Sequence, residues 1–88
     1  MANPDGAEIS IEYCWECMDT LRAVKSTQEI LLEYEDRIRQ LVLIPGENGV
    51  FEVMVNGKLV FSKTRLARHP EAGELVPLIG AALGSSAG

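Results

Sequence analysis

Apolar and polar residues alternate near the start of the chain. Ile9, Ile11 and Tyr13 are separated by polar residues, which places their side chains on one face of a β-strand. The segment covers residues 8–13 and is expected to end at Cys14. The sequence therefore predicts a first strand that leads directly into the two cysteines of the chain.

After Cys17 the apolar residues recur with the period of a helix. One side of this helix carries Leu21, Val24, Leu31, Tyr34 and Ile38. The opposite side carries Asp19, Arg22, Ser26, Glu29, Glu33 and Asp36. Residues 26–29 have the pattern of a capping box, at which the helix could kink or restart. We predict a single amphipathic helix.

A continuously apolar run at 41–44 predicts a strand that is covered on both faces. The Pro-Gly-Glu-Asn-Gly segment at 45–49 is expected to end it. Two further strands at 51–55 and 59–61 flank Asn-Gly at 56–57, the residue pair that favours a type I′ turn. This pattern predicts a β-hairpin.

The C-terminal part contains a polar connection at 63–69 and then a second long helix. Pro70 suits a first helical position, but Pro77 would clash inside a helix, so the helix starts near Gly73 or kinks. Its apolar stripe consists of Leu75, Leu78, Ile79 and Leu83. We expect the Gly- and Ser-rich tail at 84–88 to be disordered.

The order β-α-β-β-β-α predicts an α/β, thioredoxin-like fold with a four-stranded mixed sheet and two helices. A flexible N-terminus at 1–7 precedes a single domain at 8–83. If the third strand pairs with the first, the connection that begins at Pro45 and Gly46 lies beside Cys14. These two residues are therefore expected to flank any site at the cysteines.

Composition limits what such a domain does. At 88 residues the chain supports one core, and its net charge of −5 argues against nucleic-acid binding. No apolar run approaches the roughly 20 residues of a membrane helix, and the start of the chain does not resemble a secretory signal. We therefore expect a cytoplasmic protein with no membrane contact, where two neighbouring cysteines indicate metal binding or thiol chemistry.

The segment Cys14-Trp15-Glu16-Cys17 has the spacing of a redox-active pair. Both sulfurs fit one helical turn, whose free amides favour a thiolate, whereas the surrounding acidic side chains oppose it. We predict a weakly activated, reducing dithiol. Zinc requires four ligands, and only His69 offers a further nitrogen or sulfur ligand, so no metal is expected.

Neighbouring residues have simpler interpretations. Trp15 is expected to be a partly exposed aromatic that shields the pair or contacts a partner, and Tyr13 to be a packing residue. His69 is interpreted as a surface histidine. The basic residues at 63–69 are interpreted as a solvated loop, which could alternatively hold an acidic partner or the carboxylates of glutathione.

Several motifs also occur together: the strand leading into the Cys14–Cys17 pair, Leu-Arg-Ala at 21–23, Pro-Gly at 45–46, the hairpin at 51–60 and His-Pro-Glu at 69–71. This combination resembles the Rdx family, which comprises selenoproteins W, T and H and their cysteine-containing bacterial relatives. The resemblance spans roughly residues 8–83, and Pro77 departs from the family's final helix. It implies a thioredoxin-like fold and a thiol-based redox role. We expect no cofactor.

The attacking sulfur stays open between two assignments. By analogy with thioredoxin, the attacking residue would be Cys14, which is expected at the exposed start of the helix. The resemblance instead implies Cys17, the position at which some family members carry selenocysteine. Glu16 and Trp15 lie between the two.

Two functions follow from these observations. The first is a thiol oxidoreductase that reduces peroxide, glutathione-mixed disulfides or protein disulfides, with glutathione as a candidate co-substrate or a thioredoxin-type protein as electron donor. The second is a non-enzymatic, redox-responsive adaptor that binds a protein partner at the CxxC face, with Trp15 and the Phe51 hairpin edge as contacts.

Overall fold

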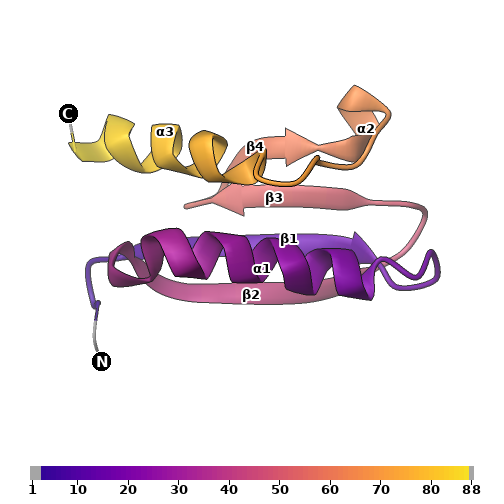
Figure 1. The fold of residues 1–88 in the computed structure, drawn as a ribbon, viewed down its shortest axis with the longest axis horizontal. Coiled ribbons are helices and arrows are strands. Elements are labelled where there is room, and N and C mark those ends of the chain that lie inside the picture. The colour runs from indigo at the N-terminus through magenta and orange to yellow at the C-terminus, as the bar shows by residue number, and fades with distance from the viewer. Residues whose placement is uncertain (1–2, 88) are drawn as a thin grey trace.

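The computed structural model describes residues 3–87 and places them in two layers (Figure 1). One layer is a four-stranded sheet in the order β2-β1-β3-β4. Its strands are β1 (Ala7–Cys14), β2 (Ile38–Gly46), β3 (Phe51–Val55) and β4 (Lys58–Ser62). β1 pairs in parallel with β2 and antiparallel with β3, which pairs antiparallel with β4. The predicted four-stranded mixed sheet is confirmed.

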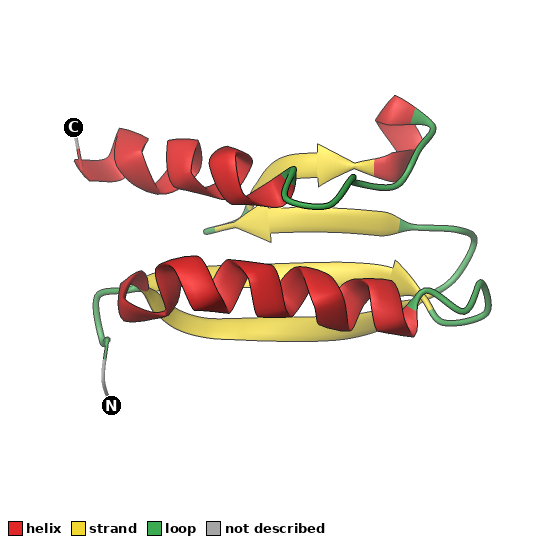
Figure 2. Ribbon diagram, viewed as in Figure 1, coloured by secondary structure: helices red, strands yellow, loops and turns green. Residues whose placement is uncertain are grey.

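Two long helices form the second layer and lie on the same face of the sheet (Figures 1 and 2). These are α1 (Thr20–Tyr34), beside β1 and β2, and α3 (Leu75–Ala87), beside β3 and β4. A short helix, α2 (Lys63–Leu66), and a 3₁₀ turn, Glu35–Arg37, occupy segments between the larger elements. The predicted polar connection at 63–69 thus contains one helical turn.

The core lies between the sheet and the two helices. Its most completely buried large side chains are Ile9, Ile11, Ile30, Phe51, Val53, Phe61, Leu75 and Ile79. The residues from β1 and β3 alternate with more exposed ones, as the period of two predicted. No helix within residues 3–87 covers the other face of the sheet (Figure 1).

The prediction that the strand at 41–44 is covered on both faces is wrong. β2 is an edge strand whose Val42 and Ile44 side chains are each 41% exposed on the face away from the helices. β2 also continues through Pro45 to Gly46, two residues beyond the expected end. Proline is tolerated there because an edge strand has a side without a pairing partner.

The predicted buried face of the first helix is only partly correct. α1 begins at Thr20, and its buried residues are Ala23, Ser26 and Ile30. Leu21 is 76% exposed, and Ile38 belongs to β2 rather than to the helix. Two of the three residues that face the sheet are small, and Leu31 and Tyr34 pack against the core while remaining partly exposed. As predicted, α1 is one helix.

Local turn chemistry was predicted correctly. Asn56 and Gly57 both have positive φ, 52° and 81°, as a type I′ turn requires. α3 starts late, at Leu75, so Pro77 is its third residue, where the missing amide would have no partner within the helix. Pro70 lies ahead of α3, so its predicted first helical position is wrong.

The two ends of the chain bear on the predicted domain limits. Ala7, within the predicted flexible segment 1–7, already belongs to β1, and the Asn3 side-chain amide donates to the backbone carbonyls of Glu35 and Ile38. α3 extends to Ala87 within the predicted tail 84–88. Residues 1, 2 and 88 lie outside the described residues, and the proposed limits stay predictions.

Candidate redox site

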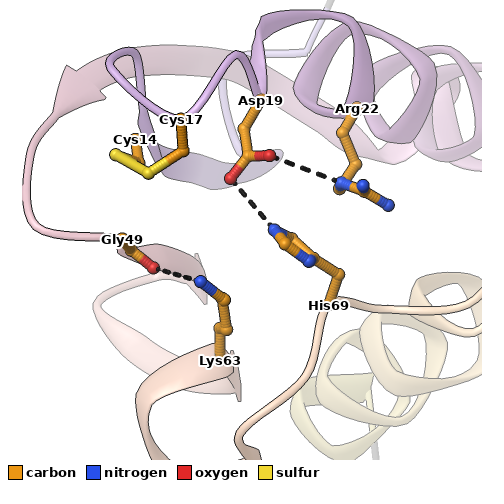
Figure 3. A network of polar contacts seen from close by, with 7 residues as sticks. All are labelled: Cys14, Cys17, Asp19, Arg22, Gly49, Lys63 and His69. Carbon is orange, nitrogen blue, oxygen red and sulfur yellow. Dashed lines mark hydrogen bonds and ion pairs between the residues drawn. A yellow bond between two sulfur atoms is a disulfide. The ribbon is translucent and has the colours of Figure 1, made fainter.

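Cys14 and Cys17 are joined as a disulfide, with their Cα atoms 5.3 Å apart (Figure 3). Cys14 is the last residue of β1, and Cys17 lies in the loop that leads to α1. The pair therefore precedes the helix, which begins at Thr20, and does not occupy its first turn as expected. The spacing correctly predicted that the two sulfurs meet.

The two cysteines differ in exposure. Cys14 is completely buried, with a relative exposure of 0%, whereas Cys17 is exposed. The expectation that Cys14 lies at an exposed helix start is thus wrong. Cys14 ends a strand that has a neighbour on each side, β2 and β3, and this central position removes it from solvent.

The connection after β2 lies beside Cys14, as predicted. Gly46 is the register partner of Cys14, and its carbonyl accepts a hydrogen bond of 3.1 Å from the Trp15 amide. Pro45 is the register partner of Tyr13. A Cβ atom at position 46 would lie 2.8 Å from a carboxylate oxygen of Glu12, so a larger residue there would require the Glu12 side chain to move.

The loop that carries Cys17 is closed by backbone hydrogen bonds. The Met18 amide donates to the Trp15 carbonyl at 3.3 Å, and the Asp19 amide donates to the Cys14 carbonyl at 3.4 Å. Met18 adopts a left-handed conformation with φ 62°, which is uncommon for a residue with a side chain. The loop thereby holds Met18 outward, with 88% of its surface exposed.

Three large apolar residues close to Cys17 in the sequence are exposed to solvent. Trp15, Met18 and Leu21 are 56%, 88% and 76% exposed, and we call these three residues the apolar rim. Tyr13 is buried, in agreement with its interpretation as a packing residue, and Glu16 is exposed. Exposed aromatic and methionine side chains are typical of surfaces that contact other proteins.

The sequence did not indicate that Asp19 and His69 interact. The Asp19 carboxylate is 5% exposed, and its Oδ2 atom lies 3.0 Å from His69 Nε2 (Figure 3). Its Oδ1 atom lies 3.6 Å from Nε of Arg22. The His69 ring meets the ring of Phe51 edge to face, with centroids 5.9 Å apart. His69 was interpreted as a surface histidine, and its side chain is 27% exposed, but its contacts with Asp19 and Phe51 were not predicted. No local signal could pair residues so far apart in sequence.

Two of the basic residues at 63–69 are bound to other groups of the chain. The Lys63 ammonium donates to the Gly49 carbonyl at 3.0 Å (Figure 3), whereas Arg68 forms two hydrogen bonds of 2.7 Å with Glu74. Each of these cations is thus already engaged with a group of its own chain. The arrangement gives no support to a shared anion site in this loop.

The Arg68–Glu74 pair predicts a small acid dependence of stability. Hydrogen bonds from Arg68 and from the Glu71 backbone lower the pKa of the Glu74 carboxyl from 4.5 to about 2. Because the folded value lies below the unfolded one, the pair stabilises the protein above pH 4.5 and loses this effect as the pH falls toward 2. The pair is partly exposed, which limits the effect.

We expect Glu74→Gln to remove this part of the acid dependence. Urea unfolding at pH 7 and pH 3 measures it, and the wild type should lose more free energy of unfolding between the two than the variant does. An equal loss in both proteins would contradict the assignment.

Within residues 3–87, no group of three or more His, Cys, Asp or Glu side chains could hold a metal ion. None of the helices in that range has the length and apolar character needed to cross a membrane.

Comparisons with known proteins agree with this geometry. A model of the Rdx family matches residues 8–81. The crystal structure of a selenoprotein W-related protein from Vibrio cholerae has a TM-score of 0.84 at 29% identity, covering 90% of this chain and 99% of that chain. A Bordetella parapertussis protein has a TM-score of 0.82 at 30% identity, covering 86% of this chain and 96% of that one. These likenesses confirm the thioredoxin-like fold class.

One curated relative is longer. Migration and invasion enhancer 1 of Bos taurus is 34% identical, over 84% of this chain and 63% of its own length. The chain thus spans less than two thirds of that relative.

Proposed function

Because the chain belongs to the Rdx family, we propose that it is a thiol–disulfide oxidoreductase that reacts through Cys14 and Cys17. The observation that carries this proposal is the contrast between an exposed Cys17 and a fully buried Cys14 within one disulfide. An incoming reagent can reach only the exposed sulfur. Cys17 is therefore the attacking residue, and Cys14 is the resolving one.

The reaction takes place in two exchange steps. The Cys17 thiolate attacks one sulfur of a substrate disulfide, forms a mixed disulfide and releases the other substrate sulfur as a thiolate. The Cys14 thiolate then attacks Cys17 Sγ, which forms the Cys14–Cys17 disulfide and releases the second substrate thiolate. The substrate gains two electrons, and two protons from solvent complete its thiols. Two thiols of glutathione or of a thioredoxin-type protein return the pair to its reduced form.

The apolar rim favours a protein disulfide as the substrate. Peroxide is too small to use Trp15, Met18 and Leu21, whereas a polypeptide that carries a disulfide would bury part of their exposed surface. Glu16 adds negative charge beside Cys17 and favours substrates with basic residues near their cysteine. Reduction of peroxide or of glutathione-mixed disulfides requires no such surface. A reducing compartment such as the cytoplasm suits this activity.

The same rim supports a second candidate function. A protein partner bound at Trp15, Met18 and Leu21 could distinguish the oxidised from the reduced loop, which would make the chain a redox-responsive adaptor. Turnover separates the two: an adaptor binds its partner without reducing it.

The double substitution Met18→Ser and Leu21→Ser tests the substrate assignment. We expect it to raise KM for a disulfide-bonded peptide with flanking Leu and Lys residues by about tenfold, the equivalent of ~1.4 kcal/mol of lost apolar contact. The reaction rate with hydrogen peroxide should stay unchanged. Steady-state kinetics with both substrates provide the measurement.

Leu32→Ser is the matched control, because Leu32 is as exposed as Leu21 and lies near the other end of α1. If the control raised KM for the peptide as much as the double variant does, the rim would have no specific role.

A further inference from the structure

Asp19 does not cap the helix that it precedes. It occupies the N-cap position of α1, where an aspartate ordinarily accepts a hydrogen bond from its own helix, yet its side chain makes no such bond. The carboxylate is directed instead to His69 and Arg22, and only 5% of it is exposed (Figure 3). The Asp19 carboxylate is buried and does not cap α1. Its contact with His69 therefore has a role other than helix capping.

His69 is held in place independently of Asp19. It lies in the connection between α2 and α3, where Arg68 is fastened to Glu74 by two hydrogen bonds of 2.7 Å. Arg68 also donates to the His69 carbonyl at 3.0 Å and lies over the Phe61 ring, 5.8 Å from its centroid. The His69 ring itself packs against Phe51. The imidazole is thus held in a fixed position by contacts with β3 and, through Arg68, with β4.

Asp19 connects the His69 ring to the cysteine pair. It follows Cys17 by two residues, and its backbone amide donates to the Cys14 carbonyl. Holding the Asp19 side chain therefore holds the end of the loop that presents the exposed sulfur. The contact also brings an imidazole nitrogen to a carboxylate whose negative charge lies close to that loop.

We propose that His69 is a positioning residue for the Cys14–Cys17 pair and acts through Asp19. It fixes the loop that presents Cys17, and its ring nitrogen offsets the charge of the Asp19 carboxylate, two residues after Cys17. The inference rests on the proposed function, in that it takes these two cysteines as the reacting pair.

The two partners have opposite expected effects on Cys17. Without the His69 nitrogen, the Asp19 carboxylate keeps only the more distant contact with Arg22, and its negative charge disfavours a thiolate at Cys17. Without the charge of Asp19, a thiolate is favoured. A merely structural contact would give changes of the same sign for both substitutions, because each would loosen the same loop.

Three variants test this in the full chain. His69→Phe keeps an aromatic ring against Phe51 but removes the nitrogen, His69→Gln keeps a hydrogen-bond donor, and Asp19→Asn keeps the polar contact without the charge. The readout is the rate at which iodoacetamide alkylates Cys17 in the reduced protein at pH 7, located by peptide mass. We expect about threefold slower alkylation in His69→Phe, about threefold faster alkylation in Asp19→Asn, and a rate within about twofold of wild type in His69→Gln.

Rates that shift in the same direction in His69→Phe and Asp19→Asn, or that stay unchanged in both, would overturn the proposal. Thermal unfolding shows whether each variant folds. If His69→Phe does not fold, the alkylation rates of Asp19→Asn and His69→Gln relative to wild type test the proposal. Alkylation requires no turnover. A wild-type chain that reduces no disulfide would therefore overturn the proposed function and leave this test intact.

Discussion

Cys17→Ser is expected to abolish reduction of disulfide substrates, with a loss of at least about 100-fold in kcat/KM. The reason is access: Cys17 is the exposed member of the pair, and Cys14 is buried at the end of the central strand β1. A serine at position 17 leaves no sulfur that an incoming disulfide can reach. Steady-state reduction of a disulfide-bonded peptide measures the effect.

Cys14→Ser is the matched variant and should behave differently. Its exposed Cys17 still attacks, but no second thiol resolves the intermediate, so the mixed disulfide with the substrate accumulates. Intact-protein mass spectrometry should detect the added mass of the substrate thiol on Cys14→Ser and not on Cys17→Ser. The reverse pattern would make Cys14 the attacking residue.

Phe51→Ala is expected to cause the largest loss of stability, about 3–5 kcal/mol in the free energy of unfolding. The Phe51 side chain is fully buried in β3, opposite Tyr13 in the antiparallel register with β1, and also supports the His69 ring. Its removal leaves a cavity between the sheet and the helices. A domain of this kind has a total free energy of unfolding of about 5–15 kcal/mol, so the Phe51→Ala loss would remove a large part of it.

Urea unfolding and thermal melting measure this effect, with Val42→Ala as the control. Val42 lies on the sheet face away from the helices and is 41% exposed, so its truncation should lower the free energy of unfolding by less than about 1 kcal/mol. A Phe51→Ala variant as stable as Val42→Ala would contradict the described core.

Features that depend on nearby residues were predictable from the sequence. The alternation at 8–13, the Asn-Gly turn at 56–57 and the late start of α3 before Pro77 all follow from local backbone preferences. The position of the 45–49 connection beside Cys14 followed from one further assumption, that the third strand pairs with the first.

Features that depend on how the layers pack were not predictable in the same way. The buried face of α1 consists of Ala23, Ser26 and Ile30. Ala23 and Ser26 are small, and a search for large apolar residues misses them. The exposure of Val42 depends on both long helices lying on one face of the sheet. An apolar run in a strand cannot by itself reveal this.

In the redox site, too, local features were predictable from the sequence and features created by packing were not. The spacing of the cysteines predicted their disulfide, but the contrast in their exposure depends on where β1 ends within the sheet. The contact between Asp19 and His69 joins residues 50 positions apart and is created by the fold. Asp19 has the sequence position of an ordinary helix cap, so no local pattern distinguishes it.

The reduction potential of the Cys14–Cys17 pair tests the central claim most directly. The protein would be equilibrated in glutathione and dithiothreitol buffers of graded potential, with Trp15 fluorescence as the signal and thiol trapping as a check. We expect a reversible, intramolecular two-electron couple near or below the cytosolic range of about −220 to −320 mV. Failure to form the disulfide at any potential would contradict the dithiol mechanism.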